Sequence, residues 1–268
     1  MDKSMKIFDI HAHIYPDAIA DRAVRTISAA YDEITILNDG RVSTLVKLMD
    51  EAQADRFAVH SVATAPKQVS SINRFVMQTA RTQPGRIIPF AALHPDMEDP
   101  WTAVDELVTA GFKGVKLHPE NQQFLVDEPK AVELFRAIAG KLPVLLHCGD
   151  YRCDNSAPER IKRMLKLVPG LTLICAHLGG WTTWEVSAAE LIGQDIWVDT
   201  SSSLYMLDEP TARRIMRGYG TDRIVFGTDY PMWTPKDEIR RLLDMKLTDD
   251  EKENILWNNH LKLFGGNI

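Results

Sequence analysis

Cysteine is scarce in this chain of 268 residues, which contains only Cys148, Cys153 and Cys175. Because their number is odd and no Cys-x-x-Cys pair occurs, the sequence argues against a disulfide framework and against a zinc site made of thiolates. The chain also lacks a run of about 18 apolar residues, which a transmembrane helix requires, and residues 1–5 lack the core of a signal peptide. We therefore expect a cytoplasmic protein with no membrane contact.

Clusters of basic residues are absent as well. The chain has 31 Lys and Arg against 37 Asp and Glu, a formal net charge of −6 at pH 7, and neither end carries a basic run. These properties argue against a nucleic-acid surface. Hydrophobic residues make up 45% and charged residues 25%, as in ordinary globular proteins, so the expected partner is a small molecule.

Short apolar runs rich in β-forming residues alternate with longer amphipathic runs along the chain, a pattern that predicts parallel strands joined by helices. The predicted strands are 6–10, 56–63, 87–93, 114–118, 144–147, 172–177, 195–200 and 223–227. The predicted helices are 41–54, 71–82, 101–110, 130–139, 157–167, 182–192, 209–218 and 236–246. Eight of each in strict alternation predict an α/β fold, a (β/α)8 TIM barrel that forms a single domain over residues 1–268. A doubly wound open sheet is the structural rival, but no Gly-x-Gly-x-x-Gly or Gly-Lys-Ser/Thr loop follows an early strand.

Residues 14–40 interrupt this alternation. They follow directly on the first predicted strand, and we predict neither a strand nor a helix within them. A long irregular segment at this end of a barrel is more often a lid over the site than a slack connection, so we expect a lid insertion over residues 14–40.

Histidine gathers where the predicted strands end, which is the edge where barrels of this kind carry their active sites. His11 and His13 lie two apart on the first strand and therefore point to one face. His147 ends the fifth strand, His177 the sixth and Asp229 the eighth. Imidazoles and a carboxylate suit a divalent metal ion, so we predict His11, His13, His147 and Asp229 as its ligands. We predict His177, with Asp229, as the catalytic acid/base pair.

Three further residues near this edge are candidates for substrate contacts. Lys116 and His118 share one face of the fourth strand. Arg152 follows the fifth strand, and its planar guanidinium could bind a substrate carboxylate, although an exposed loop arginine is the more common explanation. His60 lies inside the second predicted strand and His260 in the last helix, so we assign both a structural role.

Several segments of the chain resemble the amidohydrolase superfamily, and in particular its amidohydrolase-related group, which includes aminocarboxymuconate-semialdehyde decarboxylase. The segments are Asp9-Ile10-His11-Ala12-His13, Leu146-His147-Cys148-Gly149, Ala176-His177-Leu178-Gly179-Gly180 and Phe226-Gly227-Thr228-Asp229-Tyr230-Pro231, with residues 254–264 near the C-terminus. That group usually has Asn-Ala where this chain has Asn259-His260.

The resemblance implies the same metal ligands and an assisting role for His177. It also implies one divalent ion, zinc by preference and manganese as the alternative. In binuclear members of the superfamily a carboxylated lysine bridges two ions, a part that Lys116 could take. We favour one ion, with Lys116 or His118 lining the substrate pocket.

Three functions remain open from the sequence. The leading prediction is a metal-dependent hydrolase of a small amide, cyclic amide, lactone or ester, in which the ion activates water, Asp229 accepts its proton and His177 orients the substrate. The alternative is a metal-dependent nonoxidative decarboxylase of an aromatic or unsaturated acid, which a cationic clamp near the metal would favour. A noncatalytic metal-binding protein on the same scaffold would have a closed ion site. A homodimer is a candidate assembly, with no interface readable in the sequence.

Overall fold

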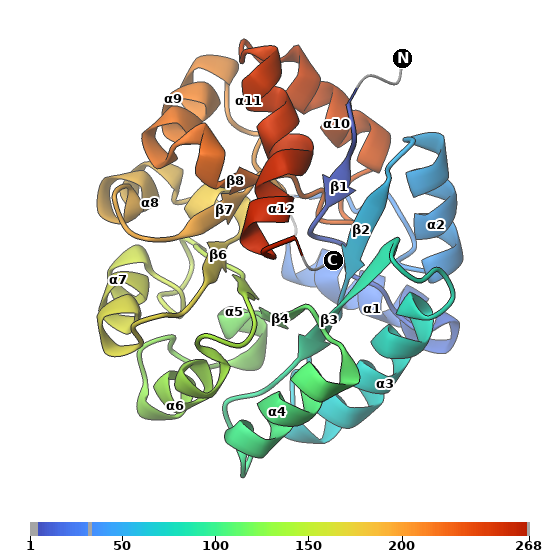
Figure 1. Ribbon diagram of the computed structural model, residues 1–268, viewed down its shortest axis with the longest axis vertical. Coiled ribbons are helices and arrows are strands. Elements are labelled where there is room, and N and C mark those ends of the chain that lie inside the picture. The colour runs from blue at the N-terminus through green and yellow to red at the C-terminus, as the bar shows by residue number, and fades with distance from the viewer. Residues whose placement is uncertain (1–4, 32–33, 267–268) are drawn as a thin grey trace.

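Parallel strands form a nearly closed barrel in the computed structural model, which describes residues 5–31 and 34–266 (Figure 1). Each strand pairs with the next in sequence order, from the first to the eighth. The predicted TIM barrel is therefore confirmed. The strands are β1 (Phe8–Asp9), β2 (Arg56–Val59), β3 (Ile87–Ala92), β4 (Gly114–Leu117), β5 (Val144–Leu146), β6 (Leu173–Cys175), β7 (Trp197–Asp199) and β8 (Ile224–Val225).

Backbone hydrogen bonds between the first and last strands complete the ring. The Ile10 amide donates to the Phe226 carbonyl over 2.9 Å, and the Asp229 amide donates to the His11 carbonyl over 2.8 Å. The second of these bonds joins the backbones of two predicted metal ligands. Ring closure thus brings together segments that lie more than 200 residues apart in the sequence.

Helices surround the barrel on its outside, as Figure 1 shows, and a helix occurs at each of the eight predicted places. Among the described residues, no helix is long and apolar enough to cross a membrane. The larger helices are α1 (Asp17–Ala30), α2 (Val42–Glu51), α3 (Val69–Ala80), α4 (Pro100–Ala110), α6 (Pro129–Ile138), α7 (Pro158–Leu167), α8 (Trp184–Leu191), α9 (Glu209–Tyr219) and α10 (Pro235–Asp244). The shorter ones are α5 (Pro119–Gln122), α11 (Asp249–Glu253) and α12 (Asn259–Leu263), with η1 (Pro66–Gln68), η2 (His177–Gly179), η3 (Thr221–Arg223) and η4 (Asn254–Asn258).

The strands are shorter than predicted, most of all at the end that carries the histidines. The second predicted strand, 56–63, ends at Val59, and beyond it only a single bridge joins His60 to His13. The regular ladder stops there because the chain departs from the barrel into the connecting segments. Apolar composition continues past this point, so composition alone overestimates the strand.

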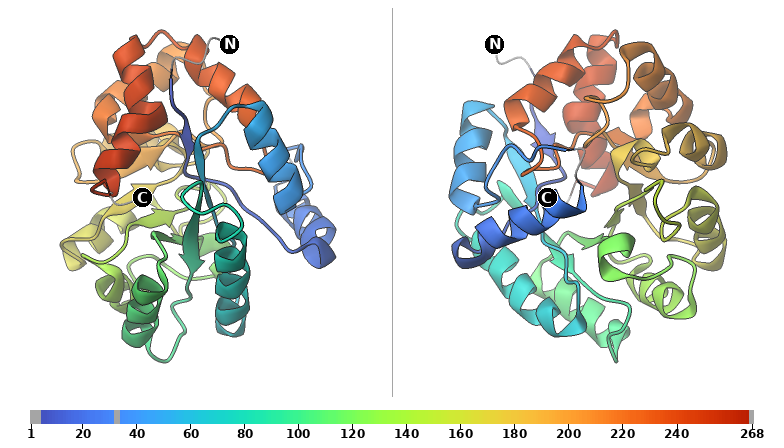
Figure 2. Two further views of the ribbon diagram at one scale, coloured as in Figure 1. Left: turned by 45° about the vertical axis from the view of Figure 1, so that its right-hand side comes forward. Right: turned by 180° about the vertical axis from the view of Figure 1, so that it is seen from behind.

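The prediction of an irregular segment over residues 14–40 is wrong, because the segment contains the 14-residue helix α1. Ile19, Ala23, Ile27 and Ala30 recur at spacings of three and four residues, which is a helical period. Pro16 stands just before the helix, where its fixed φ suits a helix start. The right-hand view of Figure 2 shows α1, in blue, lying across the barrel seen from behind.

The opposite end of the barrel is covered by the C-terminal segment. A buried cluster that includes Phe8, Ile10 and Phe90 packs against Phe264 and other residues of this segment. His260 stacks on Phe8 with ring centroids 4.4 Å apart, so this histidine has a packing role. Figure 1 shows α12 in red across this end. The barrel therefore opens toward the α1 side.

Candidate metal centre and pocket

Three predicted ligands meet at the open end of the barrel. The Nε2 atoms of His11 and His13 lie 3.2 Å apart. The Asp229 Oδ1 atom lies 3.3 Å from His11 Nε2 and 3.4 Å from His13 Nε2. The Asp229 backbone has a φ of 62°, a left-handed conformation that Asp tolerates better than most residues. The predicted convergence of these side chains from the first and eighth strands is therefore seen in the structure.

The opposite nitrogen of His11 is held by Asp199 at the end of β7. His11 Nδ1 lies 2.7 Å from Asp199 Oδ2, so Nδ1 carries the proton and the Nε2 lone pair faces the cluster. Burial, with the nearby Lys116 as the second cause, lowers the pKa of His11 to about 4. Burial alone would raise the pKa of Asp199, but His11 and other neighbours lower it to about 2. A neutral imidazole against a carboxylate is the arrangement that metal-binding histidines commonly have.

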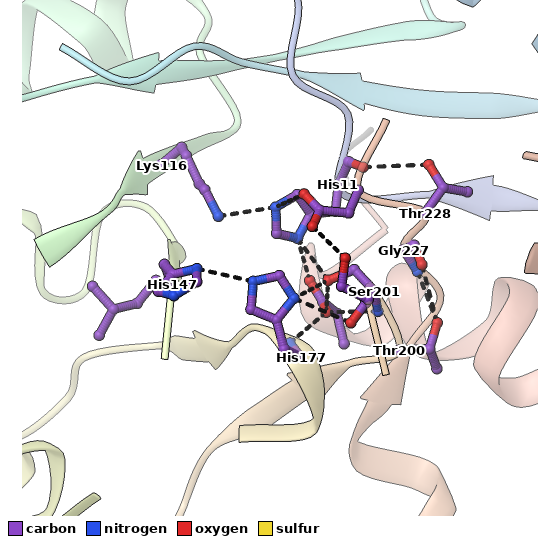
Figure 3. Close-up of polar contacts among 12 residues, drawn as sticks. His11, Lys116, His147, His177, Thr200, Ser201, Gly227 and Thr228 are labelled. Atoms are coloured by element: carbon purple, nitrogen blue, oxygen red, sulfur yellow. Dashed lines mark hydrogen bonds and ion pairs between the residues drawn. The ribbon is translucent and has the colours of Figure 1, made fainter. Parts of the chain in front are cut away.

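His177 and His147 form the second part of the site. His177 Nε2 lies 3.0 Å from His147 Nδ1 (Figure 3). The other nitrogen of each ring is close to a carbonyl oxygen: His177 Nδ1 lies 3.1 Å from the Ser201 carbonyl and His147 Nε2 lies 3.0 Å from that of Gly149. Each of these nitrogens donates its proton to the carbonyl. Two ring nitrogens with lone pairs thus face one another, which a proton or a cation between them would stabilise.

The donor set fits a divalent metal ion. Lone pairs of His11 and His13 and the carboxylate of Asp229 converge in a buried place, and burial lowers the pKa of both histidines so that they stay neutral at pH 7. Burial alone would raise the pKa of Asp229, but the surrounding histidines hold it well below its usual range. Neutral imidazoles and an ionised carboxylate are the forms that bind Zn2+ or Mn2+. His147 lies beside His177, which in turn lies beside His11. The role of His147 as a metal ligand stays a prediction.

Lys116 faces the metal cluster, which is formed by the predicted metal ligands His11, His13 and Asp229. Its Nζ atom lies 3.0 Å from His11 Nε2, and the residue is almost fully buried (Figure 3). Burial lowers the pKa of Lys116 to about 8, although Asp229 and Asp199 favour its charged form. Among the described residues that line the pocket, Lys116 does not occur. Lys116 therefore contacts a predicted metal ligand, and its contact with a substrate stays a prediction.

His118 lines the pocket, as predicted for one of the two residues on the fourth strand. Its ring stacks on that of His147 with centroids 3.9 Å apart. On its other side, His118 Nδ1 lies 3.2 Å from Glu120 Oε2. The hydroxyl of Tyr31, which follows α1, lies 3.2 Å from His118 Nε2. His118 thus connects the histidine cluster with the segment that covers the pocket.

Arg152 does not take the predicted place at the substrate. Its Nε and NH2 atoms bond both oxygens of Asp150, over 2.8 and 2.6 Å. Its NH1 donates to the carbonyl of Ala30, the last residue of α1, over 2.7 Å. The guanidinium also lies over the rings of Tyr31 and Trp181. Arg152 is absent from the described residues that line the pocket, because its fork is already occupied. Its contacts hold α1 in place.

Two residues of the site, His60 and Asp199, are not predicted from the sequence as functional. His60 is fully buried, its ring centroid lies 4.4 Å from that of His13, and neither ring nitrogen has a hydrogen-bond partner among the described residues. The sequence predicts it inside the second strand, but β2 ends one residue earlier. His60 lies two residues after Ala58, which belongs to the inner cluster, so strand alternation could have identified it. Asp199 ends β7, and the strand-end rule applied to the histidines would have included it.

A pocket of about 680 Å3 opens above the cluster. His13, His177 and Asp229 lie on its wall together with His118 and His147. Most of the remaining wall is apolar or aromatic and comes from α1, α3 and the loops between them. A pocket of this size admits a small molecule and water. The closed ion site expected of a noncatalytic metal-binding protein is therefore not what the structure has.

Comparison with known proteins was made by family and by structure. A family model described as amidohydrolase matches residues 8–266. No curated protein matches the sequence significantly. Dihydroxybenzoic acid decarboxylase from Polaromonas sp. JS666, solved with manganese and the inhibitor 2-nitroresorcinol, is 16% identical, with a TM-score of 0.77 over 98% of each chain.

Two more solved structures match over nearly the whole chain. The 5-carboxyvanillate decarboxylase from Novosphingobium aromaticivorans DSM 12444, complexed with manganese and 4-hydroxy-3-methoxy-5-nitrobenzoic acid, is 16% identical with a TM-score of 0.73, over 98% of this chain and 97% of that one. A candidate 2-pyrone-4,6-dicarboxylic acid hydrolase from Pseudomonas putida is 17% identical with a TM-score of 0.69, over 98% of this chain and 99% of that one. Because the family model spans almost all of the sequence, this chain is an enzyme that belongs to the amidohydrolase family.

Proposed function

We propose that this enzyme is a metal-dependent decarboxylase, which removes carbon dioxide from a small aromatic or unsaturated carboxylic acid. The observation that carries the proposal is the combination of the histidine cluster with a pocket whose walls include Ile27, Ile72, Phe75 and Trp181. Flat apolar walls suit a planar ring, while the cluster suits a polar group at one edge of that ring. The decarboxylases among the structural matches, two of them solved with manganese, support this function over hydrolysis.

His11, His13 and Asp229 would hold the metal ion, with His147 as the further proposed ligand and a single ion at the site. When bound, a divalent ion would orient a substrate carboxylate and neutralise part of its charge. The donor set suits both Mn2+ and Zn2+. The manganese in the matched decarboxylases favours Mn2+. The homodimer and the cytoplasmic location stay predictions.

His177 is the proposed acid/base residue. It lines the pocket, and its Nδ1 is held by Ser201, so that Nε2 is the atom that can receive and pass on a proton. In decarboxylation the carbon–carbon bond to the carboxylate breaks, its electron pair stays on the substrate carbon, and that carbon takes up one proton. His177 Nε2 takes up a proton from water in the pocket and supplies it to that carbon, and the carboxylate leaves as carbon dioxide.

Metal removal tests this function. The protein would be treated with a chelator, reloaded with Mn2+ or Zn2+, and supplied with a panel of hydroxylated benzoic acids while carbon dioxide release is measured. We expect release only from the reloaded protein, and a loss of at least about 100-fold in His177→Ala, since general acid catalysis commonly contributes that much. Release that survives complete metal removal, or that is unchanged in His177→Ala, would refute the proposal.

Hydrolysis of a cyclic ester is the second candidate. The match to a candidate pyrone dicarboxylic acid hydrolase favours it, as does the ionised Asp229 on the pocket wall, which can accept a proton from water. The same metal ligands would serve both reactions. The two differ in their products, because hydrolysis adds water and releases no carbon dioxide.

A further inference from the structure

One face of α1 is turned toward the pocket and carries a single charge. The pocket-lining residues of this helix recur at spacings of three and four residues, so they form one stripe. They are Ile19, Arg22, Ala23, Thr26, Ile27 and Ala30. Arg22 is the one lysine or arginine among the described residues that line the pocket, and Asp229 is the one acidic residue. Arg22 is itself solvent-exposed, so it is a pocket-lining cation that an anionic group of a ligand can reach.

No anionic partner is found within the described part of the protein, where no hydrogen bond or ion pair engages the Arg22 side chain. Two arginines from outside α1 that contact this helix are paired, whereas Arg25 on the helix itself is solvent-exposed and does not line the pocket. Arg41 NH1 lies 2.9 Å from Asp21 Oδ1, and Arg152 binds both oxygens of Asp150. Asp229 is itself bound to histidines and to the Ser202 hydroxyl at the metal cluster. The Arg22 guanidinium therefore offers its full set of donors to whatever enters the pocket.

The helix that carries Arg22 is held at several points. The Asp21–Arg41 ion pair connects its first half with the segment before α2. At its other end, Arg152 bonds the Ala30 carbonyl, and the Tyr31 hydroxyl bonds His118. Arg22 thus sits on a positioned element, which reduces the entropy lost when a ligand is bound.

We propose that Arg22 binds a second anionic group of the substrate, while the metal cluster binds the carboxylate that reacts. The substrate would then be an aromatic or unsaturated acid with two carboxylates, its ring lying between the apolar walls. A guanidinium matches a carboxylate with two parallel hydrogen bonds, which gives both affinity and orientation. This inference rests on the proposed function for the identity of the reacting group, and Arg22 replaces Arg152 as the cationic clamp.

Binding measurements on the manganese-loaded protein test the proposal without relying on turnover. The probes are benzene-1,3-dicarboxylate and benzoate, titrated by calorimetry into the wild type, Arg22→Gln, Arg22→Lys and the matched control Arg25→Gln, an exposed arginine on the same helix. We expect Arg22→Gln to weaken dicarboxylate binding by about 10- to 100-fold, as the loss of a charge-assisted hydrogen bond predicts, and to leave benzoate binding unchanged. The affinity of Arg22→Lys for the dicarboxylate should lie between those of the wild type and Arg22→Gln. Arg25→Gln should bind like the wild type.

The proposal is overturned if Arg22→Gln binds the dicarboxylate as the wild type does, if Arg25→Gln loses as much affinity, or if the wild type binds neither probe. Failure of the decarboxylase function is a separate result. In that case neither acid releases carbon dioxide, but the difference in affinity between dicarboxylate and benzoate, and its dependence on Arg22, are still observed.

Discussion

The rings of His11 and His177 are each oriented by a partner that contacts the Nδ1 atom. Asp199 holds His11, and Ser201 holds His177, with its hydroxyl oxygen 2.9 Å from His177 Nδ1. These partners decide which nitrogen carries the proton, and therefore which lone pair is free for a metal. Residues that never touch the ion are thus expected to affect its affinity.

Replacement of Asp199 by asparagine tests this directly. Asp199→Asn removes the negative charge beside His11 Nδ1, so we expect manganese affinity to fall about 10- to 100-fold, the usual effect of losing such a partner. Affinity is measured by titration with Mn2+ followed by electron paramagnetic resonance. The control is Asp195→Asn, an exposed residue paired with Arg223, which should bind Mn2+ as the wild type does. Equal affinity in all three proteins would show that Asp199 does not orient His11.

The sequence was sufficient to predict that His11, His13 and Asp229 converge, because strand ends meet at one edge of a barrel. It did not predict the contacts of Arg152, since a loop arginine can turn toward the pocket or toward Asp150 without any change in the pattern. His60 was missed because the apolar composition extends the predicted strand past the true end of β2. The positions of residues on strands were predictable, whereas the directions of loop side chains depended on tertiary contacts.

Among the elements, α1 supplies one wall of the pocket, and Arg152 holds its C-terminal end. We expect Arg152→Gln to raise KM several-fold for all substrates alike, because the Ala30 carbonyl and Asp150 lose their partner and α1 becomes less firmly placed. Steady-state kinetics measure the effect. Arg136→Gln is the matched control, since Arg136 bonds the carbonyl of Leu167, the last residue of α7, far from this helix in the sequence. If KM is unchanged in Arg152→Gln, the lid role of residues 14–40 is contradicted.

Helix α10 carries a buried carboxyl group that makes stability depend on pH. Burial is the main cause that raises the pKa of Glu238 to about 7 from its usual 4.5, against the effect of its Arg241 partner. The folded protein therefore binds this proton more tightly than the unfolded chain. The associated stability is present below about pH 4.5 and is lost as the pH rises through about 7.

We predict that Glu238→Gln removes this loss. Relative to the wild type, the variant should gain up to about 3 kcal/mol in free energy of unfolding between pH 5 and pH 8, which corresponds to the shift in pKa. Urea unfolding at the two pH values measures the difference, with Glu106→Gln, an exposed residue of α4, as the control. A constant difference between Glu238→Gln and the wild type across this range would contradict the account.

At the scale of elements, the order of strands and helices was predictable because hydrophobic periodicity records which faces are buried. Helix α1 was not predicted, and the reason is physical. Ala20 is its one fully buried position among the described side chains, and the rest of its inner face borders the pocket instead of a packed core. A helix that covers a cavity needs few large apolar residues, so its pattern is weak.

The whole molecule is a barrel whose two ends are covered by different segments. The C-terminal segment packs into one end through Phe264 and His260, whereas α1 spans the other and leaves a pocket beneath it. Closure of the ring between β1 and β8 places His11 beside Asp229, so the site depends on the complete barrel. We propose that this arrangement removes carbon dioxide from an acid held between the metal cluster and α1.

Product analysis in deuterated water tests that claim most directly. The manganese-loaded enzyme would be incubated with aromatic mono- and dicarboxylic acids, with carbon dioxide measured and the organic product examined by mass spectrometry. Decarboxylation predicts one carbon dioxide per product molecule and one deuteron at the carbon that lost its carboxylate. A product that has gained the elements of water, formed without carbon dioxide, would contradict the claim and establish hydrolysis instead.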